Sequence, residues 1–161
     1  MTHRTPTPDD AYLMLLGRAA YTWAYTEWSL LYIIKWATGE DLSHLVGGTG
    51  GRIVRRFESV VDDLEAPDNL RDGARESARR LLALNDRRND LLHARPATTP
   101  DTEEQRLNRW APGNDAATPG FIEHTDIERF ITELEDVEDL IDPLHEWLYQ
   151  RDQQSAETLR P

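Results

Sequence analysis

The chain has 161 residues, a formal net charge of −12 and no cysteine. A chain of this length can bury one hydrophobic core without covalent cross-links, so we expect a single domain over residues 1–161, with its core at 8–150 and a frayed tail at 151–161. The absence of cysteine excludes disulfides, thiolate metal sites and a cysteine nucleophile. The first ten residues are polar and hold no apolar signal segment, which together with the lack of cysteine favours a cytoplasmic protein.

Charge is distributed unevenly along the chain. The segment 52–95 carries 10 basic and 9 acidic residues, whereas the segment 96–161 carries 5 basic and 16 acidic residues. An acidic chain is a poor non-specific binder of nucleic acid, because affinity for a polyanion comes largely from Lys and Arg displacing counterions. Of the 18 basic residues, 17 are arginines, which suit bidentate phosphate contacts, although genomic base composition produces the same bias. Any binding groove for nucleic acid is therefore expected in the central segment.

The first long helix is predicted to run to about Thr38. Thr7 provides a capping hydroxyl, Pro8 suits the first helical position, and Gly39 ends the helix. Its sequence carries an aliphatic stripe interrupted by Glu27 and an aromatic stripe offset around the helix. The stripes consist of Leu13, Leu16, Ala20, Ala24, Leu31 and Ile34, and of Tyr21, Tyr25, Trp28, Tyr32 and Trp36. Because apolar groups cover most of the circumference, we expect a subunit interface as well as a core. Charged residues interrupt the run, so no membrane span is expected.

A glycine-rich loop and two helices are predicted to follow. Residues 39–51 include five consecutive residues with four glycines, which indicate a flexible connection, with a phosphate cradle as the alternative. A helix is expected at 52–64. A third helix, capped by Asp68, should run to His93 or Ala94 and stop before Pro96.

The last third begins with an irregular insert. Residues 97–123 lack helical periodicity, and we expect a short hairpin formed by 107–110 and 121–123. Thr125 and Glu128 form a predicted capping box, after which apolar residues alternate by threes and fours. Pro143 should bend this last helix. The predicted fold class is all-α, an up-and-down bundle of four to five helices with a short irregular or hairpin insert.

The end of the third predicted helix carries the most informative motif, an arginine and a histidine five residues apart. Ala78, Leu82, Asn85, Asn89 and His93 fall along one helical face, which is apolar first and polar over its last two turns. Polar groups on a core helix indicate partners, water or a ligand.

Glu27 raises a related question, because it interrupts the aliphatic stripe. A buried carboxylate without a partner costs several kcal/mol by order of magnitude, so we expect a nearby cation, and Arg88 is the candidate. The structural interpretation is a Glu27–Arg88 pair that fixes helix register, with His93 and the asparagines capping the helix end. The functional interpretation is an active site.

The order of elements and the motif Arg88-Asn89-x-x-x-His93 resemble the HEPN superfamily of helical ribonucleases, whose signature is R-x4-H. The resemblance covers most of the chain. It implies a homodimer in which two motif-bearing helix ends approach across a two-fold axis and form one composite site. It also implies RNA cleavage without a metal or cofactor, and an RNA substrate.

The resemblance assigns roles to residues of this chain. His93 would deprotonate the ribose 2′-hydroxyl or protonate the leaving 5′-oxygen, for which an imidazole pKa is suitable. Arg88 would bind the scissile phosphate, and Asn89 would position the phosphate or His93. Glu27, Asn85 and Arg95 are supporting candidates. The products would be a 2′,3′-cyclic phosphate and a 5′-hydroxyl.

Three functions are therefore open. The first is a metal-independent endoribonuclease, acting as a toxin or defence effector held in check by an antitoxin or another partner. The second is a non-catalytic dimeric interaction module that uses the acidic segment 133–142 to bind a basic partner. The third is a nucleotide-binding module. The histidines lack metal-ligand spacing, so no metal site is expected.

Overall fold

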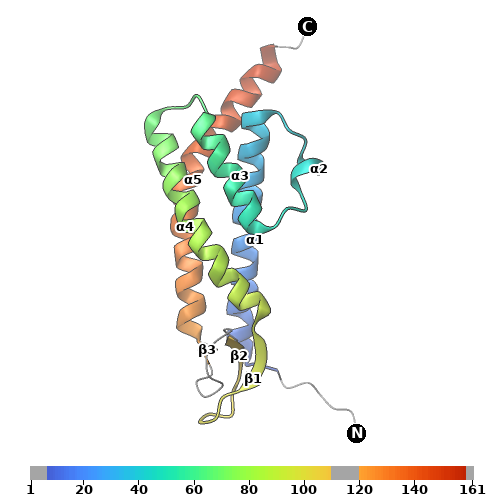
Figure 1. Ribbon diagram of the computed structural model, residues 1–161, viewed down its shortest axis with the longest axis vertical. Helices are drawn as coiled ribbons and strands as arrows, with labels where there is room; N and C mark the ends of the chain where they lie inside the picture. The colour runs from blue at the N-terminus through green and yellow to red at the C-terminus, as the bar shows by residue number, and fades with distance from the viewer. Residues whose placement is uncertain (1–6, 110–119, 159–161) are drawn as a thin grey trace.

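The computed structural model describes residues 7–109 and 120–158, and they form a bundle of helices with a small sheet at one end (Figure 1). Helices α1 and α4 each pack against both α3 and α5, so the four long helices form a ring. The helices are α1 (Asp10–Thr38), α2 (Leu42–Leu45), α3 (Gly50–Asp63), α4 (Asp68–His93) and α5 (His124–Thr158). The strands are β1 (Arg95–Thr98), β2 (Gln105–Arg109) and β3 (Gly120–Ile122). The helical bundle is confirmed, but the sheet means that the fold is not purely helical.

The directions of the helices differ from the predicted up-and-down order. The start of α3 lies beside the middle of α1, because Gly50 approaches Glu27, and both helices then run the same way (Figure 1). Helix α5 also runs parallel to α1, since Trp36 near the end of α1 contacts His145 late in α5. Only α4, of the four long helices described, runs in the opposite direction. Helices α1 and α3 can run in the same direction because the connection 39–49 returns the chain along the side of the bundle before α3 begins.

The core lies inside the ring of helices. Apolar residues at helical spacing on α3 and α5 are buried as their patterns predict, and each such side chain stabilises the fold by about 1.5–3 kcal/mol. Helix α1 differs from expectation, because its predicted aliphatic stripe is largely exposed in its first half, with Leu13 44% accessible. The buried face of α1 lies beside that stripe and consists of Tyr12, Ala19, Trp23, Leu30, Ile33 and neighbouring residues. No helix among the described residues is both long and apolar enough to cross a membrane.

Three helix starts differ from the sequence-based expectation. Asp9, not Thr7, caps α1, and its carboxylate accepts a hydrogen bond from the Tyr12 amide at 2.9 Å. Asp68 is the first residue of α4 rather than its cap, and its carboxylate pairs with Arg71. Helix α5 starts at His124, and Asp126 accepts from the Glu123 amide in place of the predicted capping box. In each case a carboxylate satisfies or complements the free amides of a first turn.

Helix α5 is longer than expected. It continues through Pro143 to Thr158 and so includes residues 151–158 of the segment that the sequence predicted as a tail. Leu144 and Leu148, which follow the proline, are fully buried, and this packing keeps the helix against the bundle. Its last turns lean away from the line of its first half, as expected for a proline that removes one backbone donor (Figure 1).

The sheet contains the predicted hairpin and one further strand. Strand β2 pairs antiparallel with β3, with Leu107 opposite Ile122, and the remainder of the expected 107–110 segment, Trp110, lies outside the described residues. Strand β1 pairs with β2 and was not predicted. It is short and contains Pro96, a residue that suits only an edge strand, so its sequence carries little strand signal.

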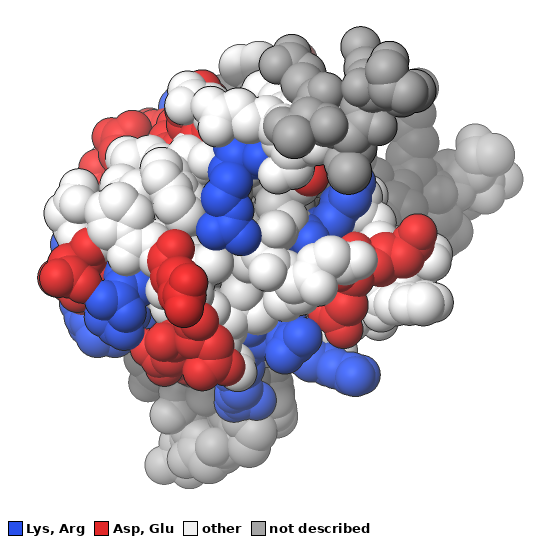
Figure 2. Space-filling model, turned by 90° about the horizontal axis from the view of Figure 1, so that it is seen from above, with Lys and Arg blue, Asp and Glu red and all other residues white. Residues whose placement is uncertain are grey.

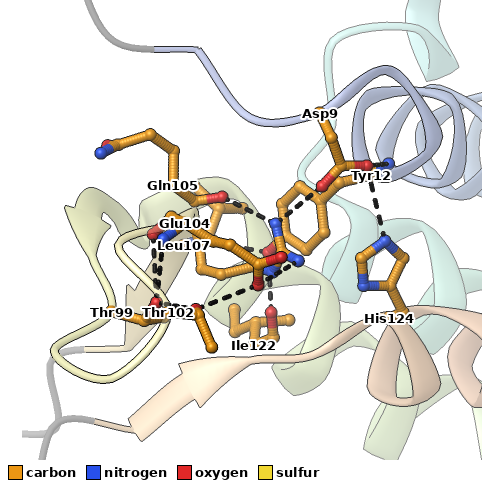
Figure 3. Close-up of polar contacts among 10 residues, drawn as sticks. Asp9, Tyr12, Thr99, Thr102, Glu104, Gln105, Leu107, Ile122 and His124 are labelled. Carbon is orange, nitrogen blue, oxygen red and sulfur yellow. Dashed lines mark hydrogen bonds and ion pairs between the residues drawn. The ribbon is translucent and has the colours of Figure 1, made fainter.

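Tyr12 attaches the sheet to α1. Its fully buried hydroxyl donates to the Ile122 carbonyl at 2.8 Å and accepts from the Leu107 amide at 3.2 Å, as the close-up in Figure 3 shows. Its ring meets His124 edge to face, with 5.2 Å between centroids. One side chain therefore contacts two strands and the first turn of α5, and it fixes the insert at the end of the bundle where α4 terminates.

Candidate functional site

A groove separates α1 from α4 at the end of the bundle near the sheet. It has a volume of about 490 Å³. Its walls are mainly apolar and include Leu16, Ala20, Ala24, Leu91, Leu92 and Pro96. Two charged residues, Glu27 and Arg88, also line it. The end of α4 that carries the Arg88–His93 motif thus borders an apolar groove.

Most arginines of α4 are neutralised by neighbouring carboxylates. Arg79 and Arg80 both bind Glu76, and hydrogen bonds from these two guanidinium groups lower the pKa of Glu76 to about 2. Arg87 pairs with Glu133 at 2.6 Å. Earlier in the helix, Arg71 and Arg75 pair with aspartates. The arginine-rich helix is therefore not a basic stripe, and Figure 2 shows basic and acidic side chains interspersed on the end of the molecule seen from above.

Arg88 is the exception. Within residues 7–109 and 120–158 it is the one arginine of α4 that has no carboxylate partner. Its guanidinium lies over the Trp23 ring, 5.7 Å from the ring centroid, and its Nη1 donates to Asn89 Oδ1 at 3.1 Å. A half-buried guanidinium with spare donors at the wall of a groove is suited to binding an anion such as a phosphate.

Trp23 forms the floor beneath Arg88. Its ring stacks on Phe130 with centroids 6.2 Å apart and an interplanar angle of 17°. The guanidinium of Arg87 in turn lies over the Phe130 ring. Trp23 is 4% exposed, and among the described residues its indole Nε1 has no hydrogen-bond partner. The guanidinium of Arg88 is thus positioned by a rigid aromatic pair rather than by a carboxylate.

Gly50 brings the start of α3 into the site. A Cβ atom at position 50 would lie 2.7 Å from Glu27 Oε1, 2.9 Å from Asn85 Oδ1 and 3.0 Å from Trp23 Cζ2. These distances are shorter than ordinary contacts of a Cβ atom, so a side chain at position 50 would require the side chains of Glu27 and Asn85 to shift. The glycine-rich segment is therefore more than a flexible connection, because it packs directly against two of the candidate residues.

The predicted ion pair between Glu27 and Arg88 is wrong. Both residues line the groove, but no ion pair joins them among the described residues, and Glu27 is half-buried rather than fully buried. The half-buried position leaves the carboxylate access to solvent, which removes the need for a partner cation. Its Oε1 lies close to Gly50, at the start of α3.

His93 does not join this cluster within one chain. It lies exposed in the last turn of α4, and the described residues provide no hydrogen-bond partner for it. Five residues along a helix correspond to a rotation of roughly 140° about its axis, so Arg88 and His93 point in different directions. Arg95, the other outlying candidate, begins β1 opposite Asn108. One chain therefore assembles Glu27, Asn85, Arg88 and Asn89, but not His93.

An exposed apolar surface continues from the groove along α1. Several large apolar side chains on this helix and at the end of α4 are accessible to solvent: Leu13, Met14, Tyr21, Tyr25, Trp28 and Leu92. Exposed apolar side chains that gather in one contiguous patch usually mark an interaction site.

Two residues of the site were not predicted from the sequence, Trp23 and Gly50. Trp23 precedes Glu27 by four residues, so helical spacing places both on one face, and this signal was available. The contact of Gly50 depends on the path of residues 39–49, which no local pattern specifies. Among the described residues, no group of three or more His, Asp or Glu side chains could hold a metal ion. Neither a protein family, nor a curated protein, nor a solved structure matches this chain.

Proposed function

We propose that this chain is a metal-independent endoribonuclease that works as a homodimer and resembles the HEPN superfamily. The observation that supports the proposal best is Arg88, a guanidinium held on Trp23 without a neutralising carboxylate, while the other arginines of α4 are ion-paired among the described residues. An arginine left available at the wall of a groove is what a phosphate-binding site requires.

The proposed reaction needs a base, an acid and an anion binder. His93 takes the proton of the ribose 2′-hydroxyl while the 2′-oxygen attacks the phosphorus and the bond from phosphorus to the 5′-oxygen breaks; the 5′-oxygen takes a proton from water, which yields a 2′,3′-cyclic phosphate and a 5′-hydroxyl. Arg88 stabilises the negative charge that develops on the phosphoryl oxygens. Asn89, which accepts a hydrogen bond from Arg88, orients the guanidinium.

The dimer supplies the missing geometry. Since His93 points away from Arg88 on its own helix, His93 of a second copy is the group that would face the Arg88 groove. Leu92, beside His93, is 57% exposed, and the groove next to it is apolar, so burial of this surface between two copies would be favourable. Because the chain carries a net charge of −12, its affinity for RNA must come from cations at the site, of which, among the described residues, Arg88 is the one that lines the groove.

The test is cleavage of RNA by the purified protein in EDTA. Arg88→Ala and His93→Ala should each lower the rate by at least about a hundredfold, the usual contribution of a general acid or base. Arg79→Ala and His44→Ala are matched controls, because both residues are exposed and lie outside the groove, and they should retain full activity. Cleavage that requires added metal, or that survives both groove substitutions, would contradict the proposal.

A dimeric scaffold without catalytic activity is the second candidate. It is favoured by the lack of an orienting hydrogen bond to His93 among the described residues, since catalytic histidines are usually held by a second group. In that case His93→Ala would leave the cellular function intact.

A further inference from the structure

A second cavity lies between α1 and α5, away from the Arg88 groove. It has a volume of about 330 Å³ and is lined by Tyr21, Thr22, Tyr25, Glu135, Glu138 and Asp139. Tyr25 and Glu27 are two residues apart, which places them roughly 160° apart around α1. The two cavities therefore open on different sides of the helix, and the Arg88 site does not account for this one.

Glu138 is the unusual residue of this cavity. It is only 9% exposed, and its Oε2 accepts a hydrogen bond from Ser29 Oγ at 3.2 Å. Its other oxygen, Oε1, is buried and has no hydrogen-bond partner among the described residues, and no ion pair of those residues includes it. A buried carboxylate oxygen without a donor is unfavourable, because the solvation lost on burial has not been replaced. Burial accordingly raises the pKa of Glu138.

The walls of the cavity suit a positively charged group. Tyr21 and Tyr25 are 73% and 55% exposed, and tyrosine rings attract cations through their faces. Asp139 adds an exposed carboxylate that has no ion-pair partner among the described residues, whereas Glu135 is already paired with Arg18. Aromatic rings beside carboxylates form a site for an organic cation, and the same carboxylates repel any anion.

The surroundings extend the negative charge along α5. Asp136 and Asp142 are exposed and, within the described ranges, take part in no ion pair. The aromatic stripe continues along α1, where Trp28 contacts Tyr32 and Tyr32 stacks on Trp36, and Trp36 meets His145 of α5. The carboxylates and aromatic rings extend over more residues than one small cation could contact. They therefore complement an extended basic segment.

We propose that the cavity between α1 and α5 binds the cationic side chain of an arginine or lysine from a basic segment of a partner protein. The incoming guanidinium or ammonium group donates a hydrogen bond to the carboxylate of Glu138 and lies against the rings of Tyr21 and Tyr25. This inference is independent of RNA cleavage, because it uses a different side of α1.

The probe for the test is a synthetic peptide of alternating arginine and glycine, titrated into full-length protein labelled with carbon-13 in its tyrosine rings. The ring signals of Tyr21 and Tyr25 should shift on binding, while that of the fully buried Tyr12 should not. Glu138→Gln should weaken binding by about tenfold or more, the range for a hydrogen bond to a charged group. Tyr25→Leu should weaken binding by a smaller factor.

The control is Glu128→Gln, which removes the same charge from an exposed position of α5 outside the cavity and should leave affinity within about twofold. Equal weakening by Glu128→Gln and Glu138→Gln would show general attraction between opposite charges and overturn the proposal. Spermidine, a small polyamine, tests the size of the ligand, and binding as tight as that of the peptide would also overturn it. Glu138→Gln removes a buried charge, so this variant is expected to fold.

Discussion

The carboxylate of Asp9 binds the guanidinium of Arg106 at 2.9 Å and so joins the first turn of α1 to strand β2. The other oxygen of Asp9 caps α1 through the Tyr12 amide, and this hydrogen bond is the main cause of the lowered pKa of Asp9. Arg106 is itself buried, its guanidinium lies 4.8 Å from the Tyr12 ring centroid, and it also binds Glu104. A local cap and a tertiary contact therefore depend on one carboxylate.

The first prediction concerns this contact. Arg106→Ala should lower the free energy of unfolding by about 2 kcal/mol, because it removes the buried hydrogen bonds of a charged group. Arg106→Lys should recover only part of the loss, since an ammonium group cannot bind two carboxylates with a planar fork. Urea denaturation measures the effect. Arg129→Ala is the control, because its pair with Asp126 is exposed and long, at 3.9 Å, and its loss should cost less than about 0.5 kcal/mol.

A second prediction follows from the raised pKa of Glu138, whose cause is burial. Below the ordinary glutamate pKa of 4.5 the group is protonated in both the folded and the unfolded chain, so it carries no penalty. As the pH rises above 4.5 and through the raised pKa of the folded state, Glu138 ionises more readily in the unfolded chain than in the folded protein. The free energy of unfolding therefore falls over this pH range. Glu138→Gln should therefore be more stable than the wild type at neutral pH.

The stability difference between Glu138→Gln and the wild type should shrink as the pH falls below 4.5. Thermal melts at several pH values measure it, and a difference that stays constant with pH would show that Glu138 is not responsible. The contribution of Asp9 to stability changes with pH in the opposite direction, because its pKa is lowered and its contribution is lost as the pH falls. Only the difference between the two proteins isolates Glu138.

These contacts show which parts of the structure the sequence could predict. The end of α1 at Gly39, the end of α4 at His93 and the β2–β3 hairpin depend on local signals, and they were predicted. The cap of α1 was predicted at Thr7, whereas Asp9 caps the helix, and a contact from Arg106, distant in sequence, accompanies this difference. Local patterns therefore specify where elements lie, whereas tertiary contacts select among local alternatives.

The candidate site was predicted in part for the same reason. Asn85, Arg88 and Asn89 are neighbours on one helix, so spacing alone brings them together. Whether Glu27 would meet Arg88 or Gly50 depended on the path of the connection between α1 and α3, and the sequence does not indicate that path. The exposed first half of α1 was mispredicted because an apolar stripe does not reveal whether it faces the core or a second copy.

The third prediction concerns Gly50. Gly50→Ala places a Cβ within 3.0 Å of Glu27, Asn85 and Trp23, so these side chains must shift, and stability should fall by roughly 1–3 kcal/mol. The same shift should lower RNA cleavage if the groove is the active site. Gly17→Ala is the matched control, because nothing lies within 4 Å of its Cβ in the middle of α1, and it should raise stability by about 0.5–1 kcal/mol. A Gly50→Ala protein as stable and as active as the wild type would contradict the close approach.

The last prediction tests whether Arg88 and His93 act across two copies. A mixture of Arg88→Ala and His93→Ala chains should regain activity that neither has alone, because a mixed dimer keeps one intact Arg88 facing one intact His93 across the two-fold axis. With free exchange about half of the dimers are mixed, and each retains one of two pairings, so about a quarter of the wild-type rate is expected. Light scattering at the assay concentration confirms that the chains are dimeric. A site formed within one chain would give no recovery, since every chain in the mixture lacks one of the two groups.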